Sequence, residues 1–135
     1  MQSRKGFLLT LGVLSMAAVP AFAHHSVQAQ FDLDKPFTLT GTVTKVEWIN
    51  PHSYLFLDVK DNAGNIKKWA FEMAGPGALR KAGLSRADRG GLKPGDSVTV
   101  NGVLAKDGTD LGLIKTITMS DGRVFTIWTD DPNAK

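Results

Sequence analysis

Short stretches in which apolar and polar residues alternate fill most of this chain and predict β-strands. In the clearest stretch Leu55, Leu57 and Val59 alternate with Tyr54, Phe56 and Asp58, which is the period-two pattern of a strand. Turn sequences rich in glycine, asparagine, aspartate and proline separate the stretches. The predicted strands are residues 37–50, 54–60, 67–73, 97–104, 113–119 and 124–128.

One helical segment interrupts the strands. Gly75-Pro76-Gly77 opens a short helix over residues 78–82, and Gly83 ends it. The predicted order is three strands, a helix, and then two or three strands. The order β-β-β-α-β-β is typical of the OB-fold, a small, partly open barrel whose helix lies between the third and fourth strands. We therefore predict an all-β protein with one short helix, folded as a small OB-fold-like β-barrel, with a generic small barrel or sandwich as the alternative.

The first residues have the features of an export signal. Arg4 and Lys5 precede an apolar run over residues 7–19, and an A-x-A cleavage box ends at Ala23. The run is shorter than the roughly 20 residues that span a membrane, so no stable membrane anchor is expected. The predicted organisation is a signal peptide (1–23), an amino-terminal arm (24–36), an OB-like domain (37–128) and a tail (129–135). The protein is expected in the periplasm or secreted, by the general or the twin-arginine route.

Composition narrows the chemistry. Without the signal peptide the net charge falls to about +1, and no lysine- or arginine-rich run occurs, so nucleic acid is not an expected partner. The chain has no cysteine, which excludes disulfides, thiolate metal sites and a cysteine nucleophile. No nucleophile constellation is present, and a domain this small offers no evident substrate cleft or second reactive group, so a binding or carrier role is favoured over catalysis.

All three histidines of the chain lie in two places, His24-His25 and His52. Cleavage after Ala23 would make His24 the amino terminus, where its α-amine and ring nitrogen can chelate one metal ion. Cu(II) suits such a site better than Zn(II), because it prefers planar nitrogen coordination. His52 lies in the loop after the first strand, which binds ligands in OB-folds. Its neighbours there are expected to be ligand-loop residues, with Asn50 orienting His52: they are Asn50, Ser53 and Tyr54.

The sequence does not decide whether His24 and His52 can reach one metal ion. The sequence Asp32-Leu33-Asp34-Lys35-Pro36 predicts a chain reversal, which would lay residues 28–31 beside the first strand. His24 would then come alongside Lys45, several residues short of His52. The alternative is that His24 and His25 form a tail and that His52 is a hydrogen-bonding turn residue.

Aromatic residues on the first three strands suggest a rival function. An exposed set could form a platform for stacking sugars or peptides, and its candidates are Trp48, Phe56 and Trp69. Trp69 shares one strand face with Phe71 and Met73, however, which favours a place in the core. The strand carboxylates, Glu72 among them, are expected on a solvated face.

Several short motifs together resemble one bacterial family, the domain of unknown function DUF6152. They are Ala23-His24-His25-Ser26, Phe31-Asp32, Lys35-Pro36, Gly41 to Trp48, Asn50-Pro51-His52-Ser53, Trp69-Ala70-Phe71-Glu72 and Leu92 to Asp96. The resemblance includes all three histidines and implies a small exported bacterial protein. It brings no catalytic residue.

The sequence thus favours an exported periplasmic protein that binds a metal ion, with Cu(II) preferred, through His24, His25 and His52. The alternative is a metal-free module that binds an envelope protein or a glycan through its aromatic strand face. A copper oxidase that uses the same histidines is a third possibility.

Overall fold

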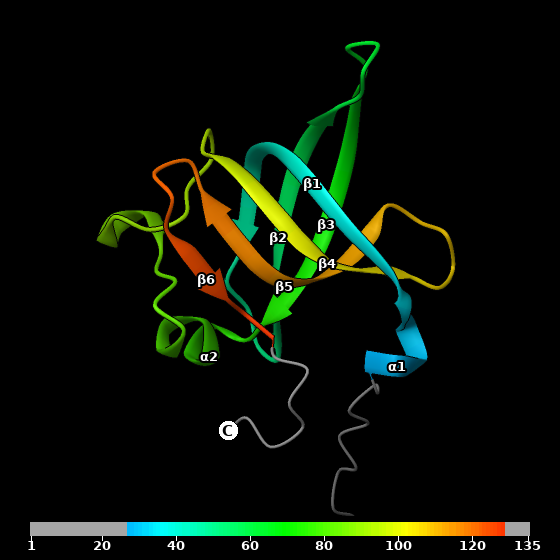
Figure 1. Ribbon diagram of the computed structural model, residues 1–135. Helices are drawn as coiled ribbons and strands as arrows, with labels where there is room; N and C mark the ends of the chain where they lie inside the picture. Colours follow the sequence, from blue (N-terminus) through cyan, green and yellow to red (C-terminus); the bar gives the residue numbers. More distant parts are fainter. Residues whose placement is uncertain (1–26, 129–135) are drawn as a thin grey trace, which may run out of the picture.

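The computed structural model describes residues 27–128, in which six strands are the main elements (Figure 1). The strands are β1 (Phe31–Glu47), β2 (His52–Lys60), β3 (Ile66–Ala74), β4 (Ser97–Ala105), β5 (Leu111–Met119) and β6 (Val124–Thr126), and the helical segments are α1 (Val27–Gln30), α2 (Pro76–Lys81) and the 3-10 turn η1 (Ala87–Arg89). Within residues 27–128 no helix is both long and apolar enough to cross a membrane. The predicted signal peptide, His24, His25 and the tail from residue 129 lie outside the described residues.

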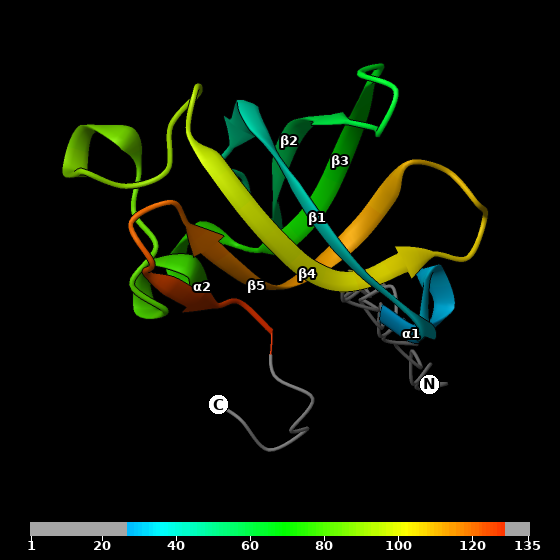
Figure 2. The same cartoon turned by 45° about the horizontal axis from the view of Figure 1, so that its top comes forward.

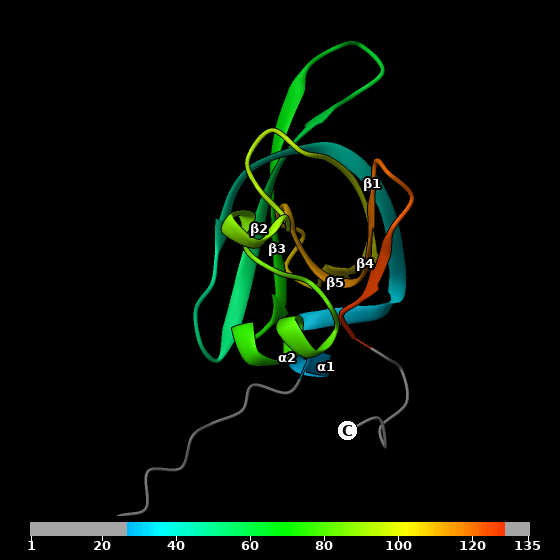
Figure 3. The same cartoon turned by 90° about the vertical axis from the view of Figure 1, so that its left-hand side faces the viewer.

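The six strands form one mostly antiparallel sheet that closes into a ring. Its order is β3-β2-β1-β4-β5-β6, and a short parallel pairing of Ala70–Glu72 with Leu111–Leu113 joins β3 to β5. Seen from the side of α2 and η1, the strands curve around a common centre (Figure 3). The helix α2 lies between β3 and β4 in the chain, so the predicted element order and all-β class are confirmed.

The core lies inside this ring and follows the predicted alternation. Leu55, Leu57 and Val59 are buried, while their neighbours on β2 are partly exposed. Phe71 on β3 is fully buried, and the ring of Trp69 stacks on it with centroids 5.7 Å apart. The interpretation of the Trp69 face as core is therefore confirmed.

The predicted reversal at residues 32–36 is wrong. β1 begins at Phe31 and runs beside β4 without turning back, so that Phe31 pairs with Ala105 and Pro36 with Val103 (Figure 2). The turn-like residues instead form an irregularity within the strand, where the Asp32 carboxylate accepts a hydrogen bond from the backbone N–H of Asp34. Phe31 is buried and holds the chain on the sheet beyond this irregularity, because its burial outweighs the local turn propensity.

A second, smaller apolar cluster lies on the outer face of the ring. Gly102 and Ile114 pair on the core side, and the next pair along, Val103 and Leu113, faces the opposite way. Partly buried side chains cover this outer cluster, among them Val27 of α1 and Trp128 after β6. The beginning and the end of the described chain are therefore anchored on the same patch of sheet.

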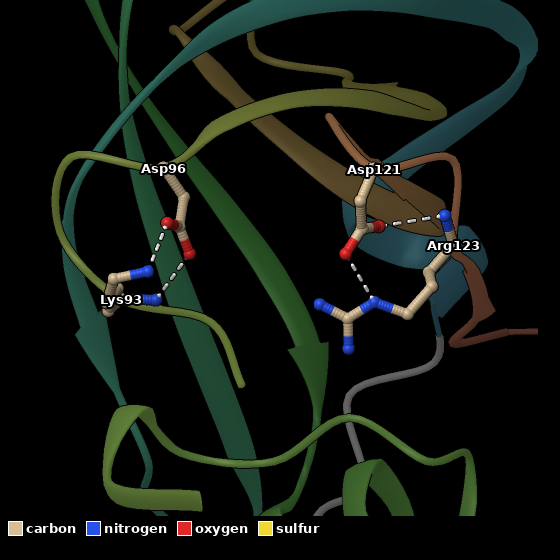
Figure 4. A network of polar contacts seen from close by, with 4 residues as sticks. All are labelled: Lys93, Asp96, Asp121 and Arg123. Carbon is tan, nitrogen blue, oxygen red and sulfur yellow. Dashed lines mark hydrogen bonds and ion pairs between the residues drawn. The ribbon is translucent and has the colours of Figure 1, made fainter. Parts of the chain in front are cut away.

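Two acidic residues fix the tight turns around β4 and β6 (Figure 4). Asp96 accepts hydrogen bonds from the backbone N–H and the Nζ of Lys93, at 2.9 and 2.8 Å. Asp121 does the same for the backbone N–H and the Nε of Arg123. The first turn is also tied to β1, because the N–H of Val43 donates to the carbonyl of Asp96.

Candidate functional site

His52 is held by a buried carboxylate. Its Nδ1 lies 2.6 Å from Oε1 of Glu72, and the side chains of His52 and Glu72 are 30% and 6% exposed. A carboxylate this deeply buried requires a polar partner. A carboxylate can only accept, so Nδ1 is the donor in this hydrogen bond and Nε2 is the ring nitrogen that remains available to another partner.

Glu72 lies on the outer face of the sheet although it is buried. Its neighbours Phe71 and Met73 point into the core, so the Glu72 side chain points away from it. Glu72 is opposite Tyr54 on β2 and beside Leu113 on β5. Three strands therefore converge around one carboxylate, and their side chains exclude water from it.

Tyr54 interacts with the same carboxylate. Its pKa is raised above the ordinary value of 10.0, first by burial, then by the negative charge of Glu72 and a hydrogen bond to it, and finally by Glu47. Burial and negative neighbours both disfavour a phenolate. Tyr54 thus keeps its proton, and its hydroxyl can donate a hydrogen bond to Glu72 while His52 binds the same carboxylate.

Trp128 borders this group of polar residues. Its ring meets the ring of His52 edge-on, with centroids 6.3 Å apart, and it also packs against the outer cluster that holds Val27. Its indole Nε1 is buried and has no hydrogen-bond partner among residues 27–128. Trp128 therefore connects the histidine to the segment where the described chain begins.

Other predicted loop residues lie apart from His52. The Ser53 side chain is fully buried on the core side, where its hydroxyl donates to the carbonyl of Ile49 at 3.4 Å. Asn50 is exposed, and its Oδ1 lies next to Gly75. Of the ligand-loop residues predicted to accompany His52, the structure brings Tyr54 to it.

The three aromatic residues predicted as a binding face do not share one face. Trp69 packs on the core side with Phe71. Phe56 is on the outer side of β2 beneath the Nζ of Lys45. Trp48 lies under the guanidinium of Arg86, with 6.0 Å between the ring centroid and Cζ.

Sequence reasoning missed the roles of Glu72 and Trp128. The turn at Asp61–Asn65 is closed by the hydrogen bond from the Asp61 N–H to the Asn65 carbonyl. Its position could have revealed that Glu72 lies near His52. Counting back along both strands from that turn sets Tyr54 opposite Glu72 and brings His52 near it. No local signal places Trp128, because only the closed sheet brings its segment to β2.

No group of three or more histidine, cysteine, aspartate or glutamate side chains within residues 27–128 could hold a metal ion. His52 and Glu72 thus form a two-residue arrangement that needs further ligands from elsewhere to bind a metal.

Comparison with known proteins gives the family of the chain. No curated protein matches it. A family model described as a family of unknown function, DUF6152, matches residues 12–115, which include the whole His52, Tyr54 and Glu72 group. The chain therefore belongs to the DUF6152 family.

Proposed function

We propose that this protein is an exported metal-binding protein that holds Cu(II) with His52 and the histidines of its mature amino terminus, His24 and His25. His24 would supply its α-amine and its ring nitrogen, and His52 would supply Nε2. Nitrogen ligands of this kind suit Cu(II), which also heads the affinity order of the divalent metals.

The observation that carries the proposal is the 2.6 Å contact between His52 Nδ1 and Glu72 Oε1. Histidines that bind metals usually donate their second ring N–H to a carboxylate or a carbonyl, which fixes the tautomer and raises the basicity of the ligand. A buried glutamate whose partners are a histidine and a tyrosine fits that role. It gives a role to an acidic side chain in a covered position.

The packing of Val27 supports a site that the amino terminus and His52 share. Val27 packs against the outer cluster, and Trp128 packs against that cluster and contacts the ring of His52. His24 precedes Val27 by three residues, which can span about 10 Å when extended. Trp128 therefore lies between the patch on which Val27 packs and the ring of His52.

The test compares two purified proteins that differ only at the amino terminus. One begins at His24, and the other begins at Ala21, which moves the α-amine away from His24 and leaves no histidine among the first three residues. Cu(II) titration followed by electron paramagnetic resonance should show one nitrogen-rich site in the first protein and at least tenfold weaker binding in the second. Intact-mass analysis of the protein exported by its host establishes which terminus occurs.

The His52→Ala variant completes the experiment. It should weaken Cu(II) binding at least tenfold, about 1.4 kcal/mol, in the protein that begins at His24. An unchanged affinity would remove His52 from the site. An exported protein whose mass shows a terminus other than His24 would exclude the α-amine of His24 as a ligand.

A further inference from the structure

A second site lies on the side of the ring where α2 and η1 are found (Figure 3). There a cavity of about 170 Å³ is lined by Trp48 and Leu84, the arginines Arg80, Arg86 and Arg89, and Asp88, with Pro76 and Ser85 completing the wall. Its volume is well above what a single water molecule needs. Three arginines around one cavity call for an explanation that the proposed metal site does not provide.

Two of the arginines, Arg86 and Arg89, lie on a tightly closed segment between Leu84 and Leu92. Leu84 and Leu92 are buried at its two ends, and the N–H of Leu92 donates to the carbonyl of Ser85 at 3.0 Å. A methyl group on Gly91 would lie 1.8 Å from that same carbonyl, so the loop closes too tightly for any other residue. The backbone that carries Arg86 and Arg89 is therefore held in place by its own packing.

The charges around the cavity are unbalanced. Arg80, Arg86 and Arg89 are exposed, and none of them forms an ion pair with an acidic side chain in residues 27–128. Asp88 is the one acidic residue of the lining, which leaves a local charge of about +2. Like charges around one cavity repel one another, and a bound anion would relieve the repulsion.

The ring of Trp48 orients one of the three arginines. The guanidinium of Arg86 lies over that ring at 6.0 Å. A guanidinium stacked on an aromatic ring keeps its N–H donors free at its edge, where they match the oxygens of phosphate or carboxylate. Arg86 is thus prepared to bind an anion with little further loss of conformational freedom.

We propose that this cavity binds the phosphate group of a small phosphate monoester. A phosphate monoester carries a charge of about −1.5 to −2 at neutral pH and three acceptor oxygens, which match the local charge and the three arginines. A wider depression of about 390 Å³ adjoins the cavity, shares Trp48, Arg86 and Asp88 with it, and has Val46 and Pro94 in its wall. That depression would receive the organic part of the ester.

The test measures binding to the protein that begins at His24 by calorimetry at constant ionic strength. The probes are glycerol phosphate and inorganic phosphate, with chloride as the reference anion. Both phosphates should bind saturably, and tighter binding of the ester would identify it as the ligand rather than free phosphate. Equal affinities would show that the site binds only the phosphate group. They would overturn the proposal that the wider depression receives the organic part of the ester.

Matched charge changes decide whether the cavity is responsible. Arg86→Ala and Arg89→Ala should each weaken phosphate binding at least tenfold, and Arg89→Lys should recover part of it. Lys81→Ala removes the same charge from the neighbouring α2, outside the cavity lining, and should change the affinity less than twofold. Thermal unfolding of each variant checks that it is folded.

Two results would overturn the proposal. One is no saturable binding of either phosphate by the unaltered protein. The other is an equal loss in Lys81→Ala and Arg89→Ala, which would mean that the ions respond to overall charge. The His52→Ala variant should bind phosphate normally, so failure of the metal proposal leaves this test intact.

Discussion

His52 Nδ1 and Glu72 Oε1 meet at 2.6 Å across two strands, and the carboxylate in this pair is the more deeply buried partner. The carboxylate holds the imidazole in one orientation and one tautomer. A histidine that served only as a turn residue would not need a buried acid behind it. The pair therefore offers the most direct way to separate a ligand role from a structural one.

Replacement of that acid tests the orientation of His52. Glu72→Gln keeps the shape of the side chain and removes its charge, and we expect it to weaken Cu(II) binding about 10- to 100-fold without changing the number of ions bound. Glu47→Gln is the matched control, because Glu47 forms an ion pair with Lys45 instead. Metal titration of both variants gives the comparison. Equal affinities in the two variants would show that Glu72 does not support a metal ligand.

The titration of Tyr54 reports on the same carboxylate without any metal. Tyr54 is the sole tyrosine of the chain, so the ultraviolet absorbance of tyrosinate measures it directly. Its pKa should lie above 10.0 and fall towards that value in Glu72→Gln, because the negative charge next to the hydroxyl is then gone. A titration midpoint that the substitution leaves unmoved would contradict the placement of Glu72 against Tyr54.

This raised pKa also affects stability. The folded protein holds the Tyr54 proton more tightly than the unfolded chain does, so the contribution is fully present below pH 10.0. It is lost as the pH rises through the folded-state pKa. Denaturant unfolding over the alkaline range should show this loss in the unaltered protein and a smaller one in Tyr54→Phe.

Local patterns predicted the strands well because each strand has one face in the core. The alternation around Leu55 and Leu57 sets the inward face of β2 wherever its partners lie. The segment at Asp32–Pro36 was misjudged because its turn-like composition competes with the burial of Phe31, which depends on β4 and α1. Such competition between local and distant contacts cannot be read from neighbouring residues alone.

The sequence predicted His52 as a candidate site residue but not Glu72, because the contacts that bury Glu72 come from distant parts of the chain. His52 stood out by its rarity and its place in a loop. Glu72 looked like an ordinary solvated strand residue, because nothing near it in sequence shows that Tyr54, Leu113 and the segment around Trp128 converge on it. Closure of the ring by β5 turns an outer position into a covered one.

Close backbone packing at Gly102 gives a test of the fold. A methyl group there would lie 1.8 Å from the carbonyl oxygen of Leu113, at the register shift between β4 and β5. Gly102→Ala should therefore lower the free energy of unfolding by about 3 kcal/mol or more. Gly77→Ala is the control, because a methyl group at Gly77 meets nothing within 4 Å and alanine favours the helix α2. Its stability should rise by about 0.5 kcal/mol, and urea unfolding of both variants measures the difference.

The turn at Lys93–Asp96 predicts a dependence of stability on acid pH. Burial alone would raise the pKa of Asp96, but hydrogen bonds from the side chain and backbone of Lys93, together with the charges of Lys93 and Arg123, bring it below its ordinary value of 3.8. The ionised Asp96 therefore stabilises the folded state above pH 3.8, and this contribution is lost as the pH falls through the lower, folded-state pKa. Asp96→Asn should cost about 1 kcal/mol at pH 7.

Denaturant unfolding of the unaltered protein and of Asp96→Asn at several pH values measures the charge contribution of Asp96. Asp96→Asn keeps an acceptor oxygen for the Lys93 N–H but loses the charge, so the gap in unfolding free energy should narrow as acid protonates the unaltered protein. Asp34→Asn is the matched control, because Asp34 is exposed and its carboxylate forms no ion pair within the described part of the chain. A gap that stays constant from pH 7 to pH 3 would mean that the turn is held by its backbone hydrogen bonds to Val43 and not by the charge of Asp96.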